Sequence, residues 1–129
     1  MTRCFRVLKH LSHMLVEALM SADDVNFFFE LREQIKLFHW QTTSFAMHKA
    51  TDGVIESLDE NIDKYVEVYM GKYGRPRVTP KNATTTIRNL NSKAIVTVVK
   101  AAIGHLQTGL VQKLKPSDTD LMNIRDEML

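Results

Sequence analysis

Apolar side chains recur every three or four positions along most of this chain, which is the period of an amphipathic helix. The first stripe, over 3–20, consists of Phe5, Leu8, Leu11, Leu15 and Leu19. The second stripe, which ends near Gln41, consists of Val25, Phe28, Leu31, Ile35 and Phe38. Ser21 and Asp24 form a typical pair at a helix start, so we expect the second helix to begin there as a separate element.

A third helix is predicted over 45–73. Residues 42–44 favour a turn before it, and Gly74 and Pro76 favour its end. The side chains on its core-facing arc are Val54, Ile55, Leu58, Ile62, Tyr65, Val66 and Tyr69. The basic, proline-containing segment 75–86 is then expected to be a loop.

The C-terminal part predicts two more helices, over about 88–114 and over 118–129, separated by Pro116 and Ser117. The β-branched run at 95–99 would suit a strand, but the helical period around it favours a buried helix. The chain has 129 residues, 44% of them hydrophobic, and only five Gly and three Pro. We therefore predict one all-α domain over 1–129, with 1–20 as an N-terminal extension helix.

Charge and cysteine content narrow the class of protein only slightly. The net charge of +2 does not imply general affinity for nucleic acid, and no run is apolar enough to suggest a membrane span. Cys4 is the only cysteine, which excludes an internal disulfide and favours a reducing compartment, so we expect a cytoplasmic protein. Because residues 1–16 contain Arg3, Arg6 and Lys9 but no acid, an organelle transit peptide is the alternative to an ordinary first helix.

An acidic ridge borders the core-facing arc of the 45–73 helix. It consists of His48, Asp52, Glu56, Asp59, Asp63 and Glu67. Neighbouring carboxylates repel each other unless a cation or a basic surface compensates them. A histidine with carboxylates, and no cysteine, suits iron, manganese or zinc, and His39 ends the preceding helix near enough to join them. The plainer interpretation is a solvated acidic margin with hydrogen-bonded histidines.

Other catalytic motifs are missing from the sequence. There is no phosphate-binding glycine loop, no His-Glu-x-x-His and no Glu-x-x-His. Di-iron sites built inside a single four-helix bundle use two Glu-x-x-His pairs. An iron site in this chain must therefore be built differently.

The ligand pattern over 35–67 resembles that of Dps-type mini-ferritins, within the ferritin-like superfamily. The matching residues are the pair His39-Trp40, then His48 and Asp52, then Asp63 and Glu67. The chain is also similar to ferritin-like proteins encoded by large DNA viruses. The resemblance implies a ferritin-like four-helix bundle, here with an extra N-terminal helix and a short last helix.

The resemblance also implies a function. His39, His48 and Asp52 would bind iron together with Asp63 and Glu67 from a second copy, and the site would act as a ferroxidase, oxidising Fe(II) with peroxide or oxygen. Such proteins form at least homodimers, often larger hollow shells that store iron, and some bind DNA. In this chain DNA binding would depend on Arg3, Arg6, Lys9, Arg75, Arg77 and Lys81.

Two departures from the family pattern matter. The connection from His39 to His48 is shorter, so the turn at 41–44 decides whether His39 reaches the site. The last helix is short, so either the 3–20 helix supplies the missing layer or the chain is a truncated form. The alternative function is therefore a ferritin-like oligomeric structural or interaction protein without an active metal centre.

Overall fold

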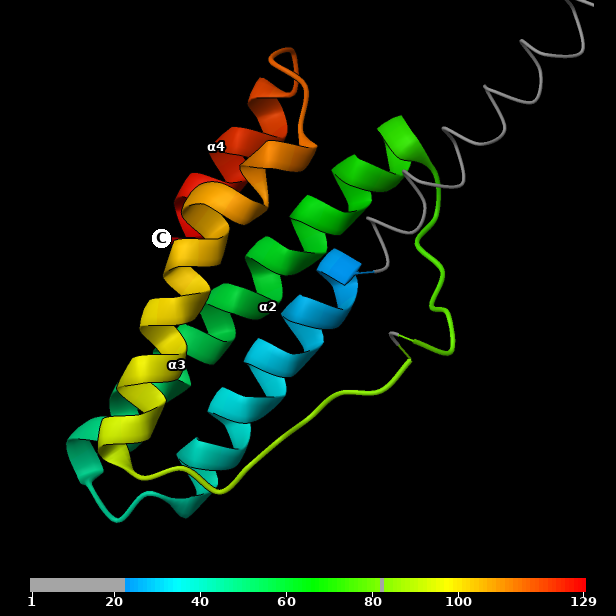
Figure 1. Ribbon diagram of the computed structural model, residues 1–129. Helices are drawn as coiled ribbons and strands as arrows, with labels where there is room; N and C mark the ends of the chain where they lie inside the picture. The colour runs from blue at the N-terminus through cyan, green and yellow to red at the C-terminus, as the bar shows by residue number, and fades with distance from the viewer. Residues whose placement is uncertain (1–22, 82) are drawn as a thin grey trace, which may run out of the picture.

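A computed structural model describes residues 23–81 and 83–129, and this part of the chain is all-helical, without a strand (Figure 1). The helices are an N-terminal one at 23–41, α2 at Phe45–Tyr73, α3 at Ser92–Gly104 and α4 at Thr119–Met128. For these residues, the prediction of an all-α chain with a short last helix is confirmed. The predicted helix over 3–20 lies outside the described residues.

One long crossover determines how the helices are arranged. The 23–41 helix and α2 are antiparallel neighbours joined by a tight turn, and residues 74–91 then run back along the length of the bundle (Figure 1). As a result α3 starts at the same end as α2 and runs parallel to it, whereas α4 returns antiparallel to α3. Since α4 has only 10 residues against 29 in α2, it packs beside one end of the bundle only.

Side chains of the 23–41 helix hold the crossover in place. The Gln34 amide donates to the Arg88 carbonyl at 2.7 Å and accepts from the Arg88 N–H at 2.9 Å, and Glu30 accepts from the Thr86 N–H at 2.9 Å. This pairing keeps residues 88–91 extended, so α3 begins at Ser92 after an Asn91 cap. The predicted start of this helix near 88 was therefore wrong.

The second half of the predicted 88–114 helix is not regular α-helix. After Gly104 the chain continues as a π-helical turn at His105–Gly109 and a 3₁₀ turn at Val111–Lys113. The His105 ring lies so close to Gly109 that a Cβ there would stand 2.4 Å from Nδ1. A side chain at position 109 would therefore displace the histidine, whose ring packs on Phe27 with centroids 4.3 Å apart.

Two apolar clusters form the core, one toward each end of the bundle. The cluster near the 42–44 turn consists of Leu31, Ile35, Phe38, Ile55, Leu58, Ile95 and Ala102. The cluster near α4 consists of Phe28, Tyr65, Tyr69, Leu106, Leu110 and Leu121. Most of the arc predicted for α2 faces these clusters, but Val54 is 43% exposed.

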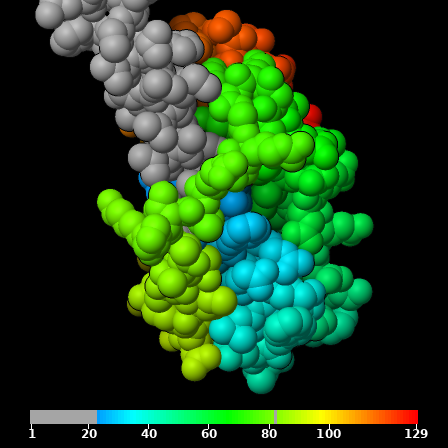
Figure 2. Space-filling model, turned by 90° about the vertical axis from the view of Figure 1, so that its right-hand side faces the viewer, coloured from blue at the N-terminus to red at the C-terminus, as the bar shows by residue number. Residues whose placement is uncertain are grey.

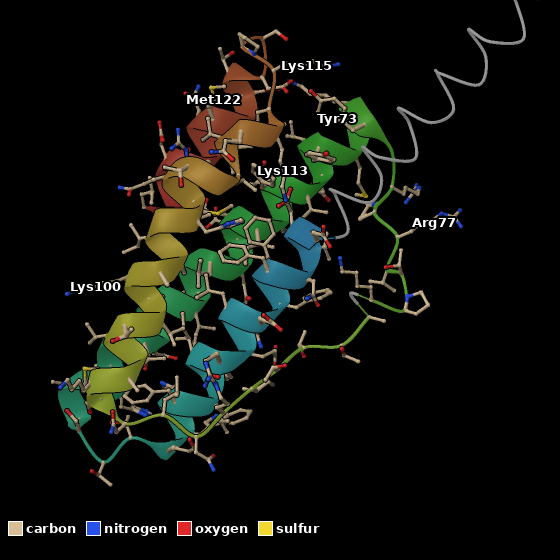
Figure 3. All side chains as sticks on the ribbon, viewed as in Figure 1. Tyr73, Arg77, Lys100, Lys113, Lys115 and Met122 are labelled. Atoms are coloured by element: carbon tan, nitrogen blue, oxygen red, sulfur yellow. The ribbon has the colours of Figure 1, made fainter. Side chains whose placement is uncertain are left out.

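A buried carboxylate fixes the start of α4 to the end of α2. Asp118 is 3% exposed and accepts hydrogen bonds from the Tyr73 hydroxyl, from the Lys115 N–H at 2.8 Å and from Lys72 Nζ at 3.1 Å. Lys115 also lies over the Tyr73 ring, 5.2 Å from its centroid, and Figure 3 shows both side chains at this end of the bundle. Burial alone would raise the pKa of Asp118, but these three donors outweigh it and lower that pKa.

Contrary to expectation, one helical stretch, Ser92–Lys113, is long and apolar enough to cross a membrane by length and composition, with a mean hydropathy of 1.4. These criteria alone are weak evidence for a membrane span, because core helices meet them too. Its inner side supplies Ile95, Leu106 and Leu110 to the core, yet only 22% of the apolar window is buried. Much of its surface is therefore left uncovered by the described part of the chain.

Candidate metal centre

His39 and His48 face each other across the turn that joins the 23–41 helix to α2. Their rings are stacked, with centroids 3.9 Å apart and planes inclined by 21°. His39 Nδ1 lies 3.0 Å from the His48 carbonyl oxygen, and His48 Nδ1 lies 3.0 Å from the His39 carbonyl oxygen. The short turn at 41–44 therefore brings the two histidines together.

The hydrogen bonds determine which ring nitrogen carries the proton. A carbonyl oxygen can only accept, so each Nδ1 must be the N–H donor. In a neutral imidazole the other nitrogen, Nε2, then keeps its lone pair, which is the form that binds a metal ion. Both histidines thus have the tautomer that backbone carbonyls commonly impose on metal-binding histidines.

Thr51 supports this pair and was missed in the sequence. Its hydroxyl is buried 3.0 Å from His39 Nδ1 and donates to the Met47 carbonyl at 2.7 Å. His39 itself is 6% exposed, whereas His48 is exposed. The only sequence signal was the position of Thr51, one helical turn beyond His48 and next to Asp52.

The Asp52 carboxylate lies near the His39 ring. Its Oδ1 lies 4.0 Å from His39 Nε2, and its side chain is 66% exposed. It also follows His48 by four residues, so the two project from the same face of α2. Three of the five predicted ligands, His39, His48 and Asp52, therefore lie at one end of the bundle, with Asp52 open to solvent.

Asp63 and Glu67 lie elsewhere on the same helix. Asp63 is 11 residues beyond Asp52, which corresponds to about 16 Å along a helix axis. Both side chains are exposed, and neither has an ion-pair partner within the described residues. One chain therefore cannot bring all five predicted ligands together. The prediction of a site shared between two copies assumes the same separation.

The other carboxylates of the ridge divide into two groups. Arg32 binds Asp59 through both carboxylate oxygens, at 2.8 and 3.1 Å, and this hydrogen bonding lowers the pKa of Asp59. Glu60, a neighbouring carboxylate of α2 outside the ridge, lies 3.1 Å from Lys64. Glu56, like Asp52, has no Lys or Arg partner in the described part of the chain. The uncompensated negative charge is therefore concentrated on Asp52, Glu56, Asp63 and Glu67.

Within residues 23–81 and 83–129 of a single chain, no group of three or more His, Cys, Asp or Glu side chains is arranged to hold a metal ion. The two histidines and Asp52 alone therefore do not form such a group. A metal site here would need further donors from outside the described residues.

The basic residues considered for DNA binding are only partly described. Arg75, Arg77 and Lys81 are exposed in the crossover, and Figure 3 shows Arg77 pointing away from the bundle. Arg3, Arg6 and Lys9 lie outside the described residues.

The comparisons with known proteins identify one family. A family model described as a family of unknown function (DUF5856) matches residues 39–129, a stretch that contains all five predicted ligands. No curated protein and no solved structure matches the chain.

Proposed function

The chain belongs to the DUF5856 family, and we propose that it binds Fe(II) at a site shared between two copies and oxidises it, as Dps-type mini-ferritins do. The observation that carries this proposal is the stacked His39–His48 pair. Both Nδ1 atoms are bound to carbonyl oxygens, which leaves the lone pair on each Nε2, and His39 Nε2 lies 4.0 Å from Asp52 Oδ1.

A two-fold pairing of α2 helices would complete the ligand set. If two copies pack their α2 helices antiparallel about an axis near residue 58, the partner's Asp63 and Glu67 come level with His48 and Asp52. All four positions lie on the ridge of α2 that is exposed in the single chain. The missing partners of Asp63 and Glu67 fit this arrangement, because a bound cation would compensate both charges.

The path of the chain also supports a ferritin-like assignment. Ferritin-like bundles contain one long crossover, which joins the second and third helices. Here residues 74–91 form such a crossover between α2 and α3, and it runs the length of the bundle. Four-helix bundles without a crossover would place these two helices antiparallel.

The proposed reaction needs little beyond this ligand set. Two Fe(II) ions each lose one electron, and one hydrogen peroxide molecule accepts both electrons and is cleaved to two hydroxide ions. Carboxylates favour the Fe(III) product, and neutral imidazoles hold Fe(II) without adding charge. The same donors also suit Zn(II) or Mn(II), so these ions are useful probes.

We expect the double substitution Asp63→Ala with Glu67→Ala to abolish metal binding, since it removes both carboxylates proposed to come from the partner. Calorimetric titration with Fe(II) under argon, or with Zn(II), measures this loss. The matched control is Asp126→Ala with Glu127→Ala, which removes the same charge from α4 and should leave binding unchanged. Absence of binding to the unaltered chain at neutral pH would rule out the proposal.

The second candidate is an oligomeric structural protein without an active metal centre. The uncovered apolar surface of α3 favours it, because such surface commonly marks a protein interface. Under this alternative, dimers would persist in the presence of chelators and in the Asp63→Ala, Glu67→Ala variant. Light scattering on the same samples distinguishes the two functions.

A further inference from the structure

All three tyrosines of the chain lie on one line along α2. Tyr65, Tyr69 and Tyr73 are spaced by four residues, so they project from the same side of the helix. The centroids of the Tyr65 and Tyr69 rings are 6.3 Å apart, and those of the Tyr69 and Tyr73 rings are 4.7 Å apart. Both distances are typical of aromatic rings in contact. These residues therefore form a continuous tyrosine stack from the core to the end of α2.

The surroundings of the hydroxyl group differ between the two ends of the tyrosine stack. Tyr65 is 1% exposed, and its hydroxyl has no hydrogen-bond partner among the described residues. Tyr73 is partly exposed, and its hydroxyl donates to the Asp118 carboxylate. Figure 3 shows Tyr73 where α2 ends, and Figure 2 shows this end of α2 (green) next to the segment before α4 (orange) at the surface. The outer end of the stack thus combines a proton acceptor with access to solvent.

Packing alone does not account for a tyrosine at position 65. A phenylalanine would fill the same space without burying an unpaired hydroxyl group, which costs stability. A redox role is one of the explanations for a buried polar group without a partner. It is a relevant one for Tyr65, because a phenol gives up an electron far more easily than the benzene ring of phenylalanine does.

We propose that the tyrosine stack carries an oxidising equivalent from the core to the surface and holds it at Tyr73. Loss of an electron makes a phenol strongly acidic, so the oxidised ring is trapped where a base accepts its proton. Tyr65 has no such base at its hydroxyl among the described residues, whereas the Tyr73 proton can move to Asp118. Lys115 lies over the Tyr73 ring and disfavours a positive charge on it, so Tyr73 loses its electron and its proton together.

The source of the oxidising equivalent rests on the proposed function. Tyr65 lies between Asp63 and Glu67 in the sequence of α2, on the core side of the same helical turns. A helix with its side chains is about 10–12 Å wide, so the Tyr65 ring is close to a metal ion held by these two carboxylates. A site that holds one Fe(II) can supply only one of the two electrons that peroxide requires. Tyr65 would supply the other.

Electrons and protons balance along this route. One peroxide molecule accepts one electron from Fe(II) and one from Tyr65, and it is cleaved to two hydroxide ions. Tyr69 then gives an electron to Tyr65, and Tyr73 gives an electron to Tyr69 while its proton moves to Asp118. The products are Fe(III), two hydroxide ions, a neutral radical at Tyr73 and a protonated Asp118.

A photo-oxidant attached at either end of the tyrosine stack tests this route without iron or peroxide. In the Cys4→Ser chain, a ruthenium polypyridyl complex is attached to the thiol of Lys64→Cys, beside Tyr65, or of Arg75→Cys, beside Tyr73. Both positions are exposed, and position 64 is nine residues, or about 14 Å, from Tyr73. A light flash with an electron acceptor in solution generates the oxidant. Optical absorption and electron paramagnetic resonance then measure the neutral tyrosyl radical in the metal-free full chain.

We expect oxidation from position 64 to give a radical whose yield falls severalfold in Tyr69→Phe and in Tyr73→Phe. Both substitutions keep the aromatic ring, so the packing of the core is preserved. Oxidation from position 75 is the matched control, in which Tyr69→Phe should leave the yield unchanged because Tyr73 is oxidised directly. If Tyr69→Phe also left the yield from position 64 unchanged, the proposal would be overturned.

Asp118→Asn tests the proton acceptor. The radical at Tyr73 should form severalfold more slowly in this variant from either position, because the proton must then be released to water. Circular dichroism at neutral pH verifies that the variant is folded. An unchanged rate would contradict the role of Asp118. Since no metal takes part in these measurements, they succeed or fail independently of the proposed iron site.

Discussion

Substitution of His39 by Ala is expected to destabilise the fold by about 2–4 kcal/mol and to abolish metal binding at the same time. The ring is buried and stacks on His48. Its Nδ1 hydrogen-bonds to the His48 carbonyl and lies 3.0 Å from the Thr51 hydroxyl. Its removal leaves a cavity and unpaired polar atoms beside the turn. Chemical denaturation measures the stability, and titration with Zn(II) measures the binding.

Comparing His48→Ala with His39→Ala separates the effect on stability from the effect on metal binding. Because His48 is exposed, its loss should lower the free energy of unfolding by only about 1 kcal/mol, the net contribution of one hydrogen bond. Metal binding should nevertheless be lost as completely as in His39→Ala. If His48→Ala bound Zn(II) like the unaltered chain, the stacked pair would be a structural feature of the turn and not a ligand pair.

Substitution of Asp118 by Ala is expected to lower the free energy of unfolding by about 3 kcal/mol, because three donors lose a buried charged acceptor. Asp120 provides the matched control. It also binds Lys72, at 2.5 Å, but its side chain is 50% exposed, so Asp120→Ala should lower that free energy much less than Asp118→Ala does. Equal losses in the two variants would contradict the role of burial.

The Asp118 effect should also depend on pH. The folded protein holds the pKa of Asp118 below its ordinary value of 3.8, so the unfolded chain takes up the proton first as the pH falls. The stability contributed by this carboxylate is therefore complete above about pH 5 and decreases as the pH falls through 3.8 and toward the folded pKa. Denaturation at pH 7 and at pH 3 should show the difference between the unaltered chain and Asp118→Ala becoming smaller.

The sequence predicted the helices well because their boundaries depend on local chemistry. Ser44 accepts a hydrogen bond from the Met47 N–H at the start of α2, and Gly74 ends that helix with a φ of 92°. The start of α3 was misjudged because it depends on Gln34, a residue 54 positions away that holds the backbone of Arg88. No local pattern around residues 88–91 contains that information.

Burial was harder to predict than helix position. Val54 has the periodicity of a core residue, yet its side chain is 43% exposed. A helical period identifies an apolar face, but only tertiary structure determines whether another element covers it.

For the candidate metal centre, the sequence proposed five ligands, and the structure shows that His39, His48 and Asp52 lie at one end of the bundle. The spacing of His48 and Asp52 predicted a shared face of α2, whereas the approach of His39 depended on the conformation of the turn at 41–44. The role of Thr51 could not be predicted, because a buried threonine within a helix has no distinctive pattern. The pairing of Asp63 and Glu67 with a second copy stays a prediction.

A complementation experiment tests the shared site most directly. His48→Ala protein and Asp63→Ala, Glu67→Ala protein are unfolded, mixed in equal amounts and refolded together. In each mixed dimer one site lacks His48 and both carboxylates. The other site is intact, with His48 from one chain and both carboxylates from its partner. Random pairing then predicts that about a quarter of the metal binding of the unaltered protein returns, although neither variant binds alone. If the mixture binds no more metal than the separate variants, the site is not shared between copies.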